Sequence, residues 1–196
     1  MAQLKMYWVK GTPIRELTLP EGYSFSVYDG SDEDKLAWLA CCRNGLINDD
    51  DGFDEFDSRI TYRKDCKQED VFFLDYEGRH VGTITAIFHP EKNCGEVHMV
   101  GMLTEFRGKG LGKYLNNKAV EKLNAQGVDY IFLTTDEWRK GAVKSYLSSG
   151  FKPVEYDEGM TQRWQAVLEE YGIDSVDMVD EDANFFKTVY RQGLQK

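Results

Sequence analysis

The chain has 196 residues, 41% of them hydrophobic, which is enough for one globular domain with a sizeable core and too apolar for a disordered protein. Asp and Glu number 34 against 24 Lys and Arg, and the resulting net charge of −10 argues against a nucleic-acid-binding protein. No apolar run approaches the ~18 residues of a membrane span, and the N-terminus lacks a secretory signal, so we expect a cytoplasmic protein without a membrane partner.

The first half of the chain predicts a strand, a helix and a hairpin. Residues 23–28 alternate aromatic residues or Val with Ser, the pattern of a half-buried strand, and we take them as the first strand. A helix is expected to begin after Ser31, a typical N-cap residue. Residues 48–57 hold six carboxylates and no cation, which favours a loop leading into a short helix. Residues 70–76 and 80–89 are rich in Val, Ile, Phe and Thr, so we expect two antiparallel strands joined by a three-residue loop.

The middle of the chain predicts a parallel crossover. Residues 95–103 form the next expected strand, with Gly101 as a bulge. Apolar residues then recur at helical spacing over 111–123, and residues 129–134 are typical of another strand. A strand, a helix and a strand in this order predict two parallel strands, whereas the earlier strands are expected to pair antiparallel.

The remaining segments are a helix over 142–147, a strand over 151–156 and an amphipathic helix over 164–171. Beyond that last helix the pattern weakens, and residues 173–196 are open to three interpretations: a docked strand, a helix or a mobile tail. We therefore expect one domain over residues 1–172, followed by an acidic tail that docks on it or stays free.

The most informative stretch is residues 107–112 (RGKGLG), which join an expected strand to an expected helix. Alternating glycines allow successive backbone N–H groups to point at one anion, and the N-terminus of the helix adds partial positive charge. A pyrophosphate is the ligand that such a loop suits. The stretch is not a Walker A motif, because neither Gly-Lys pair is followed by Ser or Thr, and its glycine spacing differs from the Rossmann fingerprint.

At this point the sequence resembles the GNAT superfamily of N-acetyltransferases, whose acyl-CoA loop reads Q or R, x, x, G, x, then G or A. Arg107, Gly110 and Gly112 match that pattern, and a Gly-Phe pair at 150–151 matches the end of a second motif of the family. The resemblance covers roughly residues 20–157. It implies an α/β fold of the α+β kind, with a mixed, mostly antiparallel sheet, helices on both faces and an acyl-CoA slot where the fourth and fifth strands splay apart.

By the same resemblance, acetyl-CoA is the acyl donor and no metal takes part. The backbone of the bulged strand is expected to pair with the pantetheine arm, and the loop is expected to hold the pyrophosphate. The residues expected to bind the donor are Met102, Leu103, Arg107, Gly108, Lys109, Gly110, Leu111, Gly112 and Ala142. The four cysteines form no C-x-x-C pair, so the residues themselves signal no zinc site either.

Two side chains are candidates for proton transfer. Amide formation requires the amine to lose a proton, and the departing thiolate gains from an acid. Glu96 stands where some GNAT enzymes place a general base. Tyr146, four residues before Gly150, stands where the family commonly places the tyrosine that protonates the sulfur. The plainer alternatives are a solvated strand-end carboxylate for Glu96 and a core tyrosine for Tyr146.

The resemblance therefore predicts an N-acetyltransferase in which a primary amine attacks acetyl-CoA directly in a ternary complex. The acidic residues within 49–57 favour a small cationic amine as acceptor, and a solvated acidic loop explains them equally well. A protein Lys or N-terminal acetyltransferase and a non-catalytic acyl-CoA-binding module are the alternatives. A homodimer is compatible with the sequence, which carries no sign of the oligomeric state.

Overall fold

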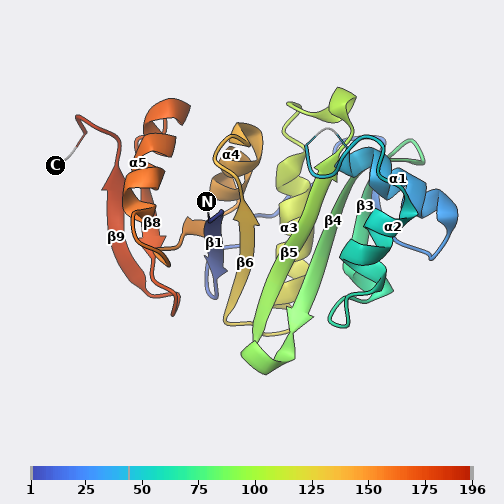
Figure 1. Cartoon of the computed structure of the whole chain (residues 1–196), viewed down its shortest axis with the longest axis horizontal. Coiled ribbons are helices and arrows are strands. Elements are labelled where there is room, and N and C mark those ends of the chain that lie inside the picture. The colour runs from blue at the N-terminus through green and yellow to red at the C-terminus, as the bar shows by residue number, and fades with distance from the viewer. Residues whose placement is uncertain (1, 44, 195–196) are drawn as a thin grey trace.

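A seven-stranded sheet with the order β2-β3-β4-β5-β6-β1-β7 forms the centre of the computed structural model, which describes residues 2–43 and 45–194 (Figure 1). Its neighbouring strands are antiparallel except for β5 and β6, which confirms the predicted mixed, mostly antiparallel fold class. The strands of this sheet are β1 (Leu4–Val9), β2 (Tyr23–Val27), β3 (Val71–Tyr76), β4 (Arg79–His89), β5 (Cys94–Met102), β6 (Tyr130–Thr135) and β7 (Lys152–Pro153). Two further strands, β8 (Ser175–Val179) and β9 (Phe185–Tyr190), pair with each other. The α-helices are α1 (Asp32–Cys42), α2 (Phe53–Phe56), α3 (Gly112–Asn124), α4 (Lys140–Ser148) and α5 (Met160–Tyr171).

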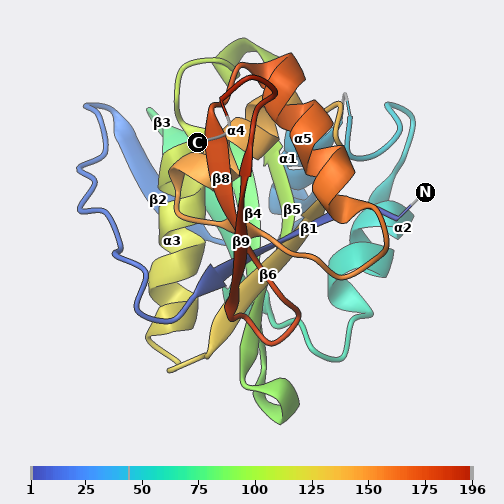
Figure 2. The same ribbon diagram turned by 90° about the vertical axis from the view of Figure 1, so that its left-hand side faces the viewer.

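Helices cover both faces of the sheet, as predicted. Figure 2 shows α3 on one side of the strands and α1 and α2 on the other. A Cβ atom on Gly82 would lie 3.3 Å from Leu115 of α3, and a Cβ atom on Gly101 would lie 2.7 Å from the carbonyl oxygen of Cys41 in α1. Both helices approach the strands this closely because these two strand positions lack side chains.

The sequence interpretation missed the strand β1. It lies between β6 and β7, pairs antiparallel with both, and leaves Leu4, Met6 and Trp8 almost fully buried. These three side chains share one face of the strand, and Tyr7 on the other face is also buried, against Val154 and Val179, so β1 is covered on both faces. Residues 23–28 are therefore the second strand, and the prediction that they form the first one was wrong.

The hairpin between β3 and β4 is tighter than predicted. Tyr76 pairs directly with Arg79, so the loop consists of two residues, Glu77 and Gly78, and not three. Both have positive φ, 49° and 80°, as a type I′ turn requires. That turn matches the twist of the two strands and therefore brings the pairing closer to the tip of the hairpin.

The bulge in β5 is also displaced from its predicted place. Thr83 pairs with Gly101 and Thr85 with His98, so two residues of β5, Met99 and Val100, lie opposite one residue of β4. Met99 carries the local distortion, with a φ of 52°. Gly101 is thus not the bulged residue, and its lack of a side chain serves the approach of α1 described above.

Strands β5 and β6 separate soon after they pair. Only residues 94–96 of β5 pair with residues 130–132 of β6, and β5 continues to Met102 and β6 to Thr135 without further pairing. This is the predicted splay between the fourth and fifth of the expected strands, which become the fifth and sixth once β1 is counted.

The segment after α5 forms a hairpin of β8 and β9 at one end of the sheet (Figure 1). Met178 and Val189 bury their side chains in the main core, so the described residues of this segment form a docked pair of strands, whereas residues 195–196 lie outside the described part of the chain. The strand predicted over 151–156 shortens to β7; Val154 still donates to the carbonyl of Lys5 in β1 at 3.0 Å and also bridges Val179, and Glu155 then donates to β8. Within the described residues, no helix is long and apolar enough to cross a membrane.

Candidate functional site

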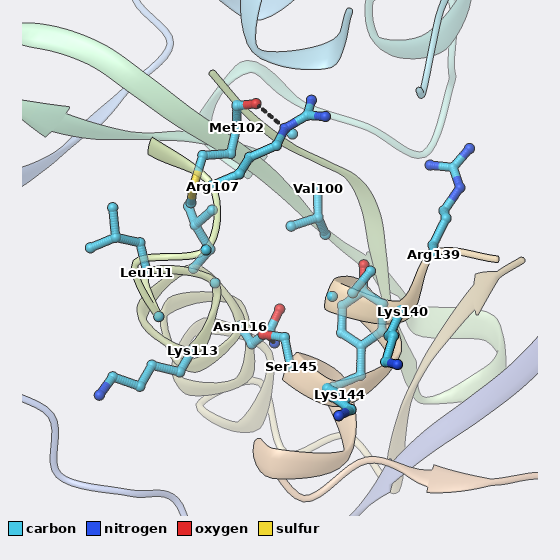
Figure 3. Close-up of a pocket in the computed structure, with 18 of the residues that line it drawn as sticks. Val100, Met102, Arg107, Leu111, Lys113, Asn116, Arg139, Lys140, Lys144 and Ser145 are labelled. Atoms are coloured by element: carbon cyan, nitrogen blue, oxygen red, sulfur yellow. Dashed lines mark hydrogen bonds between the residues drawn. The ribbon is translucent and has the colours of Figure 1, made fainter. Parts of the chain in front are cut away.

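A pocket of about 750 Å³ lies between β5 and the N-terminal parts of α3 and α4 (Figure 3). Its walls come from four segments of the chain, within residues 45–46, 100–102, 107–116 and 138–148. The predicted glycine loop is one of these walls, and the end of the bulged strand is another. The fold therefore gathers most of the residues that the sequence named for the donor around one cavity.

The glycine loop has the backbone of an anion site. Gly108 and Gly110 adopt φ values of 74° and 73°, a region that side chains disfavour, and a Cβ at either position would meet no other atom within 4 Å. Helix α3 follows at once, and its N-cap residue, Leu111, offers no side-chain acceptor to the first N–H groups. These groups and the helix dipole are therefore left to attract a negatively charged group.

Positive charge surrounds the same cavity. Among the described residues that line it, five side chains are basic and none is acidic. The basic ones are Arg107, Lys113, Arg139, Lys140 and Lys144 (Figure 3). In a protein with a net charge of −10, this local excess of cations indicates a polyanionic ligand.

Two of these cations also brace the walls of the pocket. Arg107 Nε donates to the carbonyl of Met102 at 2.9 Å, and its Nη2 donates to the carbonyl of Arg43 at 3.0 Å. Arg139 Nε donates to Asp136 at 3.0 Å, and its Nη2 donates to the carbonyl of Gly45. The segment after α1 is thus tied to both sides of the pocket.

Helices α3 and α4 meet at a polar contact in the pocket wall. Asn116, fully buried in α3, donates from Nδ2 to the hydroxyls of Ser145 and Ser149, both at 3.1 Å. A Cβ at Gly112 would lie 2.7 Å from Ser145 Oγ, so glycine permits this approach. The sequence interpretation missed Asn116 and Ser145. A polar residue beside Leu115 on the apolar face of a predicted helix was the available signal.

Tyr146 lies in the pocket wall, where the sequence interpretation required it. Its side chain is 7% exposed, and its ring packs edge-on against Phe151 with centroids 6.0 Å apart. Burial raises the pKa of Tyr146 to about 12, so its hydroxyl is protonated at neutral pH. None of the described residues forms a hydrogen bond with that hydroxyl, which leaves it available to a bound molecule.

Glu96 is the last residue of β5 that pairs with β6, at the closed end of the splay, and it does not line the pocket. Arg63 donates to both of its carboxylate oxygens, from Nη1 at 3.1 Å and from Nη2 at 2.8 Å. His89 Nε2 lies 3.0 Å from Oε2. Burial by itself raises the pKa of Glu96, but the hydrogen bonds and charge of Arg63, together with smaller effects of His98 and His89, outweigh burial, so the pKa lies below its ordinary value.

The partners of Glu96 were not found from the sequence. Arg63 follows the short helical turn Asp57–Thr61, 33 residues before Glu96, and no spacing in the sequence connects the two, because their contact depends on how the chain packs against the sheet. His89, in contrast, ends β4 only seven residues before Glu96, across the hairpin to β5.

Of three further residues that the sequence analysis expected to bind the donor, one lines the cavity and two do not. Ala142 lines it at the start of α4. Leu103 does not line it, and its N–H donates to the carbonyl of Val81 at 3.0 Å. Lys109 does not line it either, and its ammonium lies 4.6 Å above the ring of Phe106.

The acidic segment follows directly on the pocket wall at Leu46. Asp50 and Asp54 are exposed, whereas Glu55 pairs with Arg59. The short helix predicted at the end of this segment is present as α2. Negative charge therefore begins where the positively charged cavity ends.

Comparisons with known proteins add to this geometry. Residues 34–151 match the acetyltransferase (GNAT) family. The mycothiol acetyltransferase of Frankia casuarinae is 28% identical over 178 residues, which are 84% of this chain and 51% of that protein. That of Streptomyces griseus is 30% identical over 147 residues, 74% of this chain and 48% of that protein. The chain thus spans about half the length of these curated relatives.

Solved structures share the fold. A GCN5-related N-acetyltransferase from Sphaerobacter thermophilus superposes with a TM-score of 0.62 at 20% identity, covering 78% of this chain and 49% of that one. The NatC complex bound to Gag peptide and CoA contains a chain with a TM-score of 0.50 at 16% identity, covering 64% of this chain and 82% of that one. At these identities the likeness concerns the fold alone.

Proposed function

Because the chain belongs to the acetyltransferase (GNAT) family, we propose that it transfers the acetyl group of acetyl-CoA to a primary amine by direct attack in a ternary complex. The observation that carries this proposal is the glycine loop at the uncapped start of α3, which opens into a cavity whose described lining has five basic side chains and no acidic one. The pyrophosphate and the remaining phosphate of the donor need this combination of free N–H groups and cations.

The transfer would use two groups of this chain for proton movement. The amine nitrogen attacks the thioester carbonyl, the C–N bond forms, and the C–S bond breaks. Glu96, directly or through water, takes the proton that the amine loses. Backbone N–H groups at the Met99 bulge stabilise the oxyanion, and Tyr146 donates its hydroxyl proton toward the departing thiolate.

Calorimetry with acetyl-CoA tests the binding part of the proposal. Gly110→Asp places a carboxylate on the loop, so we expect affinity to fall at least about tenfold through charge repulsion. Gly127→Asp is the matched control: Gly127 has a φ of 78°, also with no atom near a Cβ, but it follows the opposite end of α3. Equal affinity in the two variants, or no binding to the folded wild type, would overturn the donor site.

Thiol release with a panel of amines tests the transfer itself. Production of free CoA that depends on an added amine supports the proposal. Saturable binding of acetyl-CoA without release of thiol for any amine or peptide would identify a non-catalytic acyl-CoA-binding module. Release only with Lys-containing or N-terminal peptides would place the protein among the protein acetyltransferases.

For the acceptor we propose a small cationic amine, drawn by the acidic segment beside the pocket. Replacing Asp50 and Asp54 by Asn should raise the KM of a diamine by about threefold at low salt, with no change for a neutral amine, because exposed charges act through a screened field. The double variant Glu158→Gln and Asp182→Asn removes the same charge at exposed sites in the C-terminal part of the chain. Equal effects of the two double variants would refute a local role.

A further inference from the structure

Arg63 joins two carboxylates at the closed end of the splay. Its guanidinium donates to both oxygens of Glu96, at 3.1 and 2.8 Å, and to both oxygens of Asp65, at 2.9 and 2.7 Å. The side chain is 23% exposed and that of Glu96 is 15% exposed. A bidentate contact of this kind fixes the plane and the direction of a carboxylate as well as its charge.

The contact fixes Glu96 where the slot begins. Glu96 pairs with Phe132 as the last rung between β5 and β6, and Val100, four residues further along β5, already lines the donor pocket. Arg63 comes from outside the sheet, just beyond the turn Asp57–Thr61 that packs over this face through Ile60. A rotation of the Glu96 side chain would break both hydrogen bonds to this separate element.

We propose that Arg63 is a positioning residue for the transfer, which holds the Glu96 carboxylate at the closed end of the slot in the orientation that receives the proton of the amine. This inference rests on the proposed function, because it presupposes that Glu96 is the base. Arg63 itself touches neither substrate. It acts through the direction and the charge of the carboxylate.

The charges around Glu96 leave this role to Arg63. His98, on the same strand, has a pKa lowered by burial against the opposing effect of Glu96, so it carries little charge at neutral pH, and only in acid does its charge add to that of Arg63. His89, from the end of β4, lies between Glu96 and the carboxylates of Asp65 and Glu91. Of these groups, only Arg63 brings a permanent positive charge within hydrogen-bond distance of both Glu96 oxygens.

The test measures the titration of Glu96 and the pH profile of acetyl transfer in the same variants. Arg63→Gln removes the charge and the bidentate contact, and Arg63→Lys keeps the charge but not the fork. Arg191→Gln is the matched control, because Arg191 pairs with Asp174 near the C-terminus. Carbon-detected NMR of ¹³C-labelled glutamate carboxyls, with the Glu96 signal assigned by Glu96→Gln, follows the titration without needing any substrate.

We expect Arg63→Gln to move the Glu96 titration and the acid limb of kcat/KM to higher pH together, by about one unit or more, because the opposing cation is lost while burial remains. Arg63→Lys should leave the acid limb near that of the wild type and lower kcat severalfold, since an ammonium cannot hold both oxygens. Arg191→Gln should match the wild type. If folded Arg63→Gln and Arg63→Lys both kept the acid limb and kcat of the wild type, the positioning role would be refuted.

Glu96→Gln separates this failure from failure of the proposed function. If it keeps the full rate and the acid limb, Glu96 is not the base and the inference falls with that assignment. If it abolishes transfer while both Arg63 variants transfer normally, only the inference about Arg63 is overturned. Should Arg63→Gln not fold, Arg63→Lys alone tests the positioning role: a lower kcat with an unchanged acid limb supports it, and an unchanged kcat refutes it.

Discussion

Replacing Tyr146 by Phe removes one oxygen from the pocket wall and should slow the chemical step. With a pKa of about 12, the phenol is a weaker acid than an ordinary thiol, so complete transfer of its proton to the departing thiolate is uphill. In the proposed transfer the hydroxyl would therefore act mainly as a hydrogen-bond donor to the departing sulfur. A hydrogen bond to a charged acceptor contributes about 1.5–3 kcal/mol, which predicts a roughly 10- to 150-fold fall in kcat.

Steady-state thiol release, with stability measured in parallel, checks this prediction. The KM for acetyl-CoA should stay within about twofold of the wild type, because the contact strengthens only as charge develops on sulfur. Tyr171→Phe is the matched control, since Tyr171 is also buried, and its hydroxyl has no partner among the described residues, but it lies in α5. Neither variant should lose stability. A kcat for Tyr146→Phe within threefold of the wild type would refute the reasoning.

The pH profile offers a second reading of the same residue, and two further variants test the packing that supports the site. Because burial raises the pKa of Tyr146 to about 12, the phenol stays protonated and the wild-type rate should show no alkaline fall from this group below about pH 10. Gly101→Ala should destabilise the fold by about 1–3 kcal/mol and raise the KM for acetyl-CoA, because its Cβ would lie 2.7 Å from the backbone of Cys41 beside the pocket. His80→Ala should cost about 3 kcal/mol in urea unfolding, because His80 Nε2, 3.0 Å from Asp34, and Nδ1, against Asp75, separate two buried carboxylates.

The parts of the site that the sequence could predict are those made by neighbouring residues. The loop over 107–112 can be recognised from the sequence because its glycines, the strand before it and the helix after it are contiguous. Its backbone N–H groups also need no distant partner to form an anion site. Tyr146 was placed by its register with Gly150 and Phe151, and the structure puts it in the wall of the same cavity. Features made by neighbouring residues in this way do not depend on contacts between distant segments.

The parts that the sequence could not predict depend on contacts between distant segments. The strand β1 lacks a clean alternation, because Tyr7 is buried as well as Met6 and Trp8, so its pattern identifies a strand only once β6 and β7 are known to flank it. The displaced bulge has the same origin, because Gly101 marks the approach of α1, whereas the strain falls on Met99. Nothing local distinguishes Arg63 from any other cation in a polar segment.

The distribution of charge in the folded chain offers a reason for the order of its parts. The segment after α1 is held by Arg107 and Arg139 through the carbonyls of Arg43 and Gly45, so it forms the rim of the cationic donor pocket. The same segment then runs into the acidic residues 48–57. An anionic donor and a cationic acceptor would therefore be drawn to opposite sides of one short stretch of backbone, and the two reactants would meet where the opposing fields adjoin. The net charge of −10 does not indicate this arrangement, because a sum over the whole chain shows neither the basic nor the acidic region.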